Sequence, residues 1–305
     1  MNQAYYLLVS LRPRQWLKNL SVFAALFFGG RALDPESLVP VIFVFLIFCC
    51  LSSSMYLVND LVDIQADKAH FSKKNRPISA GFIPKNLAGG TALLLVVIGL
   101  VTSYQLSSLV FLTSLTFLSV QILYSLLLKR VIIIDILAIA FGFMLRVFAG
   151  SFVIAEPLSS WLILTVMMLA IFLAVGKRRS EITLLTHQQA ALHRQILSHY
   201  PIAFLDGLTF IMATASLLTY SLFTFNTARA STFINNYLPA TLNNPRWLMI
   251  TIPLVVYGIF RYLYLIFEKK EGESPEKILL SDFPLFSTVS LWLLVVFLII
   301  YVFRV

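Results

Sequence analysis

Long apolar runs separated by short polar connectors dominate this chain. Several runs reach about 20 residues, the length of helix that crosses the hydrocarbon core of a bilayer. The strands of a membrane barrel would alternate apolar and polar positions instead, and these runs do not alternate. The pattern therefore predicts an all-α, polytopic membrane protein with nine transmembrane helices. The expected spans, of which the first is the shortest, are residues 17–30, 38–58, 88–105, 109–127, 132–153, 158–176, 200–225, 246–267 and 284–303.

Composition supports a membrane protein and excludes other classes. Of the 305 residues, 59% are hydrophobic and 12% are charged, whereas about a quarter of a typical soluble domain is charged. No linker interrupts the pattern, so we expect one membrane domain over residues 1–305. The N-terminus lacks a charged region and a cleavage site of small residues, so its first helix is expected to be an uncleaved anchor. No basic stripe with interleaved aromatic residues is found, so we expect no nucleic-acid partner.

The positive charges are distributed unevenly between the two sides of the predicted spans. Seventeen Lys and Arg residues fall on one side and four on the other, while Arg146 and Arg261 lie inside spans. Because Lys and Arg are enriched in cytoplasmic loops, we expect the N-terminus and the charged loops 59–87 and 177–199 in the cytoplasm. Nine spans then leave loop 226–245 and the C-terminus outside.

Four polar side chains at the end of the second expected span are the first candidate site. Asn59, Asp60, Asp63 and Asp67 would share one helix face, because residues three and four apart are neighbours. Carboxylates near the hydrocarbon are costly and usually functional. Oxygen-only ligands suit Mg²⁺, and no Cys or His cluster favours zinc. The alternative is a solvated helix end whose carboxylates pair with nearby lysines.

Basic residues follow this acidic cluster directly. Lys73, Lys74 and Arg76 would face the phosphates that a bound metal bridges. The alternative is the ordinary positive charge of a cytoplasmic loop, which we favour for Lys68 and Lys85. For Arg76, which Pro77 follows, we favour phosphate binding.

Two motifs in this region resemble a known family. The stretch NDLVDIQAD matches the N-D-x-x-D-x-x-x-D motif of UbiA-type intramembrane prenyltransferases, and NRPISAG resembles the basic stretch that follows it. The resemblance implies a nine-helix UbiA-type bundle with a cytoplasmic-facing active site. It also implies bound Mg²⁺, with Asp60, Asp63 and Asp67 as catalytic residues.

Four further segments resemble a subgroup, the decaprenyl-phosphate phosphoribosyltransferases. They are LRPRQWLKN at 11–19, GFMLRVFAG at 142–150, GKRRSE at 176–181, and FRYLY with GESPEKILLSD between 260 and 282. Subgroup enzymes join phosphoribosyl pyrophosphate to a polyprenyl phosphate lipid, and the product feeds arabinofuranose donors for cell-envelope polysaccharides. The resemblance thus implies a Mg²⁺-dependent phosphoribosyltransferase that releases pyrophosphate, in a bacterial inner membrane.

One segment departs from the pattern of the wider family. Aromatic prenyltransferases carry a second D-x-x-x-D on the sixth helix, where this chain reads KRRSE over residues 177–181. A basic segment here argues against an allylic diphosphate clamped between two acidic clusters. It favours one metal cluster and a separate cationic pocket for a second phosphate.

The resemblance also adds candidates that lie elsewhere in the chain. Asp135 and Arg146 would lie near one face of the fifth span, where structural ion pairs with other helices are the alternative. Asp135 would hold ribose hydroxyls or a lysine. Asp206, Glu273 and Asp282 have no role that the sequence defines. The expected substrate-binding residues are Lys18, Lys73, Arg76, Tyr124, Lys129, Asp135, Arg146, Lys177, Arg178, Glu181 and Arg261.

Two other functions stay open from the sequence. One is a UbiA-type enzyme that moves an isoprenoid from its diphosphate to an aromatic or lipid acceptor, for which the segment at 177–181 is the discriminating feature. The other is a transporter, which should show broken helices paired between repeats near the midplane. The oligomeric state, a homo-oligomer included, and the isoprenoid length are not defined by these residues.

Overall fold

The regular structure is helical throughout the residues that the structure describes. The computed structural model describes residues 3–69, 73–183, 200–226, 246–268 and 274–303. The chain divides into two compact units, residues 1–157 (unit 1) and 158–305 (unit 2). The single membrane domain expected from the sequence stays a prediction.

Eight described helices are long and apolar enough to cross a membrane, and the chain is an integral membrane protein. Each carries an apolar window of 18 residues, as a bilayer requires. Eight of the nine expected spans therefore have a matching helix. The eight candidate spans are Pro35–Val62, Lys85–Leu106, Ser108–Leu126, Ile134–Val153, Ser160–Thr183, Ile202–Asn226, Trp247–Phe267 and Phe283–Val302.

The first expected span, 17–30, is not a long α-helix. A 3₁₀-helix of 11 residues (η1, Pro13–Phe23) leads into a five-residue α-helix (α2, Ala24–Phe28). At about 2.0 Å per 3₁₀ residue and about 1.5 Å per α-helical residue, the two would extend about 30 Å. That is the thickness of a bilayer core. Within the described ranges a ninth crossing thus depends on this segment, and the count of nine is not confirmed.

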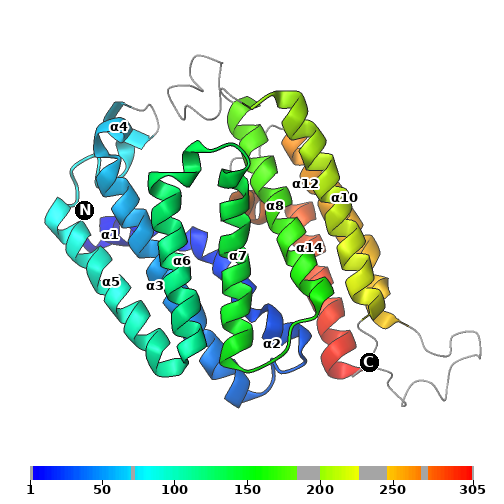
Figure 1. Ribbon diagram of the computed structural model, residues 1–305. Helices are drawn as coiled ribbons and strands as arrows, with labels where there is room; N and C mark the ends of the chain where they lie inside the picture. Colours follow the sequence, from blue (N-terminus) through cyan, green and yellow to red (C-terminus); the bar gives the residue numbers. More distant parts are fainter. Residues whose placement is uncertain (1–2, 70–72, 184–199, 227–245, 269–273, 304–305) are drawn as a thin grey trace, which may run out of the picture. The chain divides into compact units, whose positions relative to one another are not determined.

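Unit 1 is built on four long helices that lie side by side (Figure 1). The cap of α3 shows why it starts where it does: the Asp34 side chain accepts a hydrogen bond from the Glu36 N–H at 3.2 Å, and Pro35 suits the first turn. The long helices are α3 (Pro35–Val62), α5 (Lys85–Leu106), α6 (Ser108–Leu126) and α7 (Ile134–Val153). Four shorter elements complete the unit with η1 and α2: α1 (Gln3–Ser10), α4 (Ile64–Ala69), η2 (Lys73–Asn75) and η3 (Leu128–Arg130).

The 3₁₀ segment η1 packs against α3 and α7 in unit 1. Gly150 of α7 makes the close approach: a Cβ there would lie 1.9 Å from the Val22 carbonyl oxygen, so no larger residue fits. Small residues at such contacts let helix backbones approach in a membrane, where the hydrophobic effect does not drive association. Gly150 is the last residue of the GFMLRVFAG segment, and Val22 lies three residues after the LRPRQWLKN segment. The contact therefore brings these two parts of the chain together.

Unit 2 is a second group of four long helices (Figure 1). In its core, Phe172, Tyr262, Leu265 and Ile266 pack with Ile278 of the short helix α13. Gly176 lets α8 approach α12, since a Cβ there would lie 2.7 Å from Ile266 Cδ1. The elements are α8 (Ser160–Thr183), α10 (Ile202–Asn226), η6 (Trp247–Thr251), α12 (Ile252–Phe267), α13 (Pro275–Ser281), α14 (Phe283–Phe297) and the π-helical turn η7 (Leu298–Val302).

Candidate active site

The acidic motif spans the point where α3 ends. Asn59 and Asp60 belong to the last turn of α3, Asp63 caps it at φ −89° and ψ 9°, and Asp67 lies on the short helix α4. Backbone hydrogen bonds still run from the Asp63 N–H to the Asn59 carbonyl and from the Asp67 N–H to the Asp63 carbonyl. The expected single helical face is therefore interrupted at Asp63, where two helices meet.

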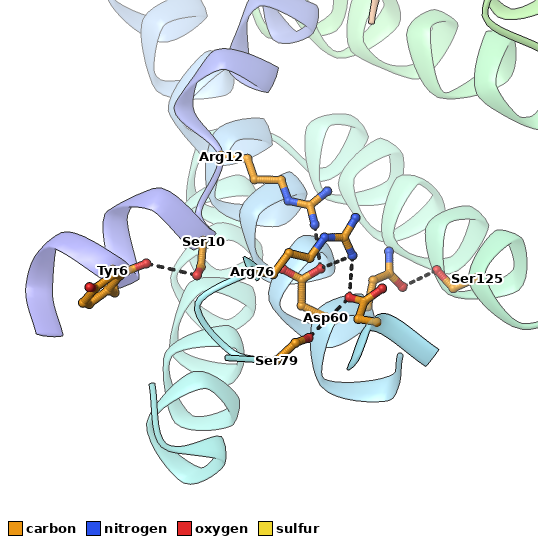
Figure 2. Close-up of polar contacts among 9 residues, drawn as sticks. Tyr6, Ser10, Arg12, Asp60, Arg76, Ser79 and Ser125 are labelled. Carbon is orange, nitrogen blue, oxygen red and sulfur yellow. Dashed lines mark hydrogen bonds and ion pairs between the residues drawn. The ribbon is translucent and has the colours of Figure 1, made fainter. Parts of the chain in front are cut away.

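Two arginines converge on the buried carboxylates of this motif, as Figure 2 shows. Arg12 Nη2 lies 2.5 Å from Asp60 Oδ1, and Arg76 Nη1 lies 3.0 Å from the same oxygen. Arg76 Nη1 also lies 2.7 Å from Asp67 Oδ2. Asp60 and Asp67 are 1% and 3% exposed, so their charges need these partners. The expected proximity of Arg76 to the acids is thus seen in the structure.

Sequence reasoning missed Arg12, which comes from the N-terminal segment 48 positions before its partner Asp60. Its backbone adopts the left-handed conformation, with φ 54° and ψ 61°. That conformation is uncommon for a residue with a Cβ, and such strain clusters at functional sites. Its guanidinium also lies 5.0 Å from the centre of the Tyr56 ring. The signal available in the sequence was the LRPRQWLKN segment itself, which starts one residue before Arg12.

Asp63 differs from the two acids beside it. Its side chain is half-buried and forms no hydrogen bond or ion pair with another described residue. Asn59 Oδ1 accepts a hydrogen bond from the Ser125 hydroxyl at 2.7 Å, which ties α3 to α6. Tyr124, an expected substrate ligand, precedes Ser125 and is half-buried.

The donor set at this helix end suits a hard divalent cation. Asn59, Asp60, Asp63 and Asp67 offer oxygen atoms only, which is what Mg²⁺ prefers. Among the described residues no three acidic, His or Cys side chains already converge as a metal site. Guanidinium groups instead contact the carboxylates of Asp60 and Asp67. The chemistry of these oxygen donors therefore fits the ion.

Arg146 is buried in unit 1 and donates hydrogen bonds to two groups there. Its Nε donates to Asn19 Oδ1 at 2.6 Å, and its Nη1 donates to the Gly142 carbonyl at 2.6 Å. The guanidinium also lies 4.6 Å from the centre of the Phe117 ring. Asn19, on η1, is thus a hydrogen-bond partner of Arg146 in another segment of the chain. These contacts connect η1 to α7.

The other expected ligands in unit 1 are more dispersed. Lys18 Nζ donates to Gln15 Oε1 at 2.5 Å on η1, and half-buried Lys129 lies on η3. Asp135 is fully buried in the first turn of α7. The side chain of Lys73 lies outside the residues that the structure describes.

The basic segment at the end of α8 is held together by one acid. Glu181 Oε2 lies 2.5 Å from Arg178 Nη1, and Glu181 Oε1 lies 3.8 Å from Lys177 Nζ. Arg178 is 1% exposed, whereas about a third of the Lys177 side chain is accessible. The expected spatial association of these three residues is therefore seen within unit 2, and Lys177 is the accessible member.

Two other arginines of unit 2 have structural partners. Arg179 Nε lies 2.6 Å from Asp206 Oδ1, and its Nη1 donates to the Ile266 carbonyl at the end of α12. Arg261 forms a two-pronged ion pair with Asp282, at 3.1 and 2.8 Å, and Asp282 also caps α14. Roles for Asp206 and Asp282, which the sequence left undefined, are thus ion pairing and capping. Glu273 lies outside the described residues.

Comparison with known proteins connects this geometry to a family. A model of the UbiA prenyltransferase family matches residues 19–286. The chain is 34% identical to a decaprenyl-phosphate phosphoribosyltransferase of Mycolicibacterium smegmatis over 90% of this chain and 86% of that one. It is 32% identical to the protein of the same name from Corynebacterium glutamicum, over 92% and 82%. A UbiA homolog from Archaeoglobus fulgidus, solved with GPP and Mg²⁺, shares the fold at a TM-score of 0.69, 18% identity, and 97% and 99% coverage.

Proposed function

Because this chain belongs to the UbiA prenyltransferase family, we propose that it transfers a phosphoribosyl group between two phosphorylated substrates. The donor is phosphoribosyl pyrophosphate, the acceptor is a polyprenyl phosphate of the decaprenyl type, and pyrophosphate leaves. The relatives named decaprenyl-phosphate phosphoribosyltransferase are similar to this chain along most of their length, which supports the proposal.

The observation that carries the proposal is the charge at the end of α8. Glu181 is the one acid of the KRRSE segment, and it already contacts both Lys177 and Arg178. It therefore neutralises cations and does not form half of a second acidic metal site. A cationic helix end with an accessible lysine fits a substrate phosphate. Two phosphorylated substrates need such a second anion site, whereas prenyl transfer to an aromatic ring does not.

The chain's own residues mainly position charge in this reaction. Asn59, Asp60, Asp63 and Asp67 would hold Mg²⁺, which when bound supplies charge neutralisation for the pyrophosphate leaving group. Arg76 and Lys73 would bind the donor phosphates, and Lys177 and Arg178 would hold the phosphate of one substrate. The acceptor phosphate oxygen is anionic at neutral pH, so it attacks the anomeric carbon without a general base as the bond to pyrophosphate breaks.

One reconstituted assay tests this function. Detergent-purified protein would be incubated with Mg²⁺, phosphoribosyl pyrophosphate and decaprenyl phosphate, and the lipid product would be followed by mass spectrometry. We expect polyprenyl-phosphoryl-ribose 5-phosphate, its loss with EDTA and its return with excess Mg²⁺. A prenylated aromatic product from an isoprenoid diphosphate, with no phosphoribosyl lipid formed, would contradict the proposal.

We also propose an orientation in a bacterial inner membrane, with the N-terminus and the acidic motif cytoplasmic. If the segment 13–28 crosses, the C-terminus lies outside. Ala80 and Ser108 are exposed residues placed before and after α5, which spans once. In a background with Cys49 and Cys50 replaced by Ala, we expect Ala80→Cys to react with an impermeant thiol reagent only from the cytoplasmic side. Ser108→Cys should react only from outside, and the reverse pattern would overturn the orientation.

A further inference from the structure

The carboxylates that would hold a metal are occupied by arginines. Arg12 and Arg76 both bind the same oxygen, Asp60 Oδ1, and Arg76 also binds Asp67. Two cations that share one acceptor oxygen repel each other, so the carboxylates must offset this repulsion to hold the arrangement. It is therefore a cluster that a competing anion can take apart.

The charges of the three carboxylates and the two arginines nearly cancel. Asp60, Asp63 and Asp67 carry three negative charges, and Arg12 and Arg76 carry two positive charges against them. A divalent cation that entered alone would face two guanidinium groups and one uncompensated carboxylate. A divalent cation that entered with a diphosphate would bring anionic oxygens to which both guanidinium groups could transfer.

Arg12 is suited to such a transfer. Its side chain is 29% exposed, and it contacts Asp60 through one nitrogen only. By contrast, Arg261 donates hydrogen bonds to both carboxylate oxygens of Asp282, and Asp282 also caps α14. Arg12 also connects the left-handed backbone turn before η1 directly to the acidic motif.

We propose that Arg12 is a resident cation of the acidic motif that excludes a lone divalent metal and then binds the diphosphate of the donor. This inference rests on the proposed function. In the absence of substrate Arg12 pairs with Asp60, and when a metal–diphosphate complex enters it moves to the diphosphate. Metal binding and diphosphate binding are therefore coupled, and Arg12 makes the coupling.

Metal binding tests this without any turnover. Mn²⁺ retained by detergent-solubilised protein would be measured by equilibrium dialysis and electron paramagnetic resonance, with and without stoichiometric pyrophosphate, against empty micelles. For the wild type we expect pyrophosphate to raise the apparent Mn²⁺ affinity at least tenfold. Arg12→Gln should bind Mn²⁺ alone at least tenfold more tightly than the wild type, and its gain from pyrophosphate should shrink.

Two matched variants make the result specific. Arg14→Gln removes the same charge from an exposed position two residues away, and it should behave as the wild type. Arg12→Lys keeps the charge and should restore weak binding of Mn²⁺ alone. Thermal unfolding in detergent would be recorded for each variant, so that a variant that binds no metal because it is unfolded can be recognised. A folded Arg12→Gln protein that binds no Mn²⁺ contradicts the inference.

The outcomes separate this inference from the proposed reaction. If Arg12→Gln and Arg14→Gln bind Mn²⁺ alone equally, or if the wild type binds it as tightly without pyrophosphate, Arg12 is not the coupling residue. The proposed phosphoribosyl transfer is tested separately, by whether the wild type forms the phosphoribosyl lipid product. Coupling without that product would leave the role of Arg12 intact and overturn the reaction.

Discussion

The ends of α3 and α8 carry opposite charge, and they neutralise it in different ways. At the end of α3, Asp60 and Asp67 are paired by arginines from other segments of unit 1. At the end of α8, Glu181 pairs with two cations of its own helix. The first cluster keeps one acid, Asp63, without an ionic partner among the described residues. The second keeps an excess of positive charge.

The difference indicates how each site would respond to a ligand. Pairs within one helix are fixed by the helix itself, since residues three and four apart are neighbours. The arrangement of charges at the α8 end is therefore fixed by the helix before any ligand binds. The pair that joins Arg12 to Asp60 across 48 positions depends on the placement of separate segments. The inferred rearrangement at the α3 end, on entry of a metal–diphosphate complex, is therefore not opposed by the geometry of a single helix.

Asp63→Ala should have the largest effect on turnover. Removing one strong transition-state stabiliser typically lowers the rate by about 10²–10³, and Asp63 is the acid that no arginine occupies. Stability should change little, because no ionic partner is left behind. Product formation and thermal unfolding in detergent would be measured together. Activity within a few-fold of the wild type in folded protein would remove Asp63 from the metal site.

Lys177→Ala should weaken the cationic site at the end of α8. A hydrogen bond to a charged group is worth about 1.5–3 kcal/mol, so kcat/KM for one phosphorylated substrate should fall roughly 10- to 150-fold. Steady-state kinetics with each substrate varied in turn would identify which phosphate is bound.

Lys277→Ala is the matched control for this change, because Lys277 is an exposed lysine elsewhere in unit 2. Glu181→Gln should be milder than Lys177→Ala, since it leaves both cations in place. If Lys177→Ala and Lys277→Ala have the same kinetics, the basic segment acts only through membrane topology.

Arg179→Met should affect stability and leave turnover per folded molecule nearly unchanged. Arg179 holds Asp206 and the Ile266 carbonyl and lies 3.7 Å from the centre of the Phe267 ring. Its loss should cost roughly 1–3 kcal/mol, read as a lower temperature of thermal inactivation in detergent. Lys177→Met is the contrasting variant, with lower turnover and ordinary stability. If Arg179→Met lowers turnover as much as Lys177→Met does, the structural role assigned to Arg179 cannot be separated from the substrate-binding role assigned to Lys177.

Local composition predicted the helices and the acidic motif, because apolar runs and clustered carboxylates are visible within a few residues. It did not predict that η1 would wind as a 3₁₀-helix or that Asp63 would end α3, since hydropathy does not report hydrogen-bond spacing. The partners Arg12 and Asn19 were missed for another reason. They meet Asp60 and Arg146 only after distant segments pack, and nothing local records those contacts.

The contact between Asn19 and Arg146 has a consequence for how the protein is made. The two residues are 127 positions apart, and ribosomes add about 5–20 residues per second. The N-terminal segment therefore leaves the ribosome about 6–25 s before α7, against which Gly150 allows it to pack. During that interval a short 3₁₀ segment with buried Asn19 has no native partner on α7. The N-terminal segment should thus reach its native packing only after α7 has been synthesised, although it is made first.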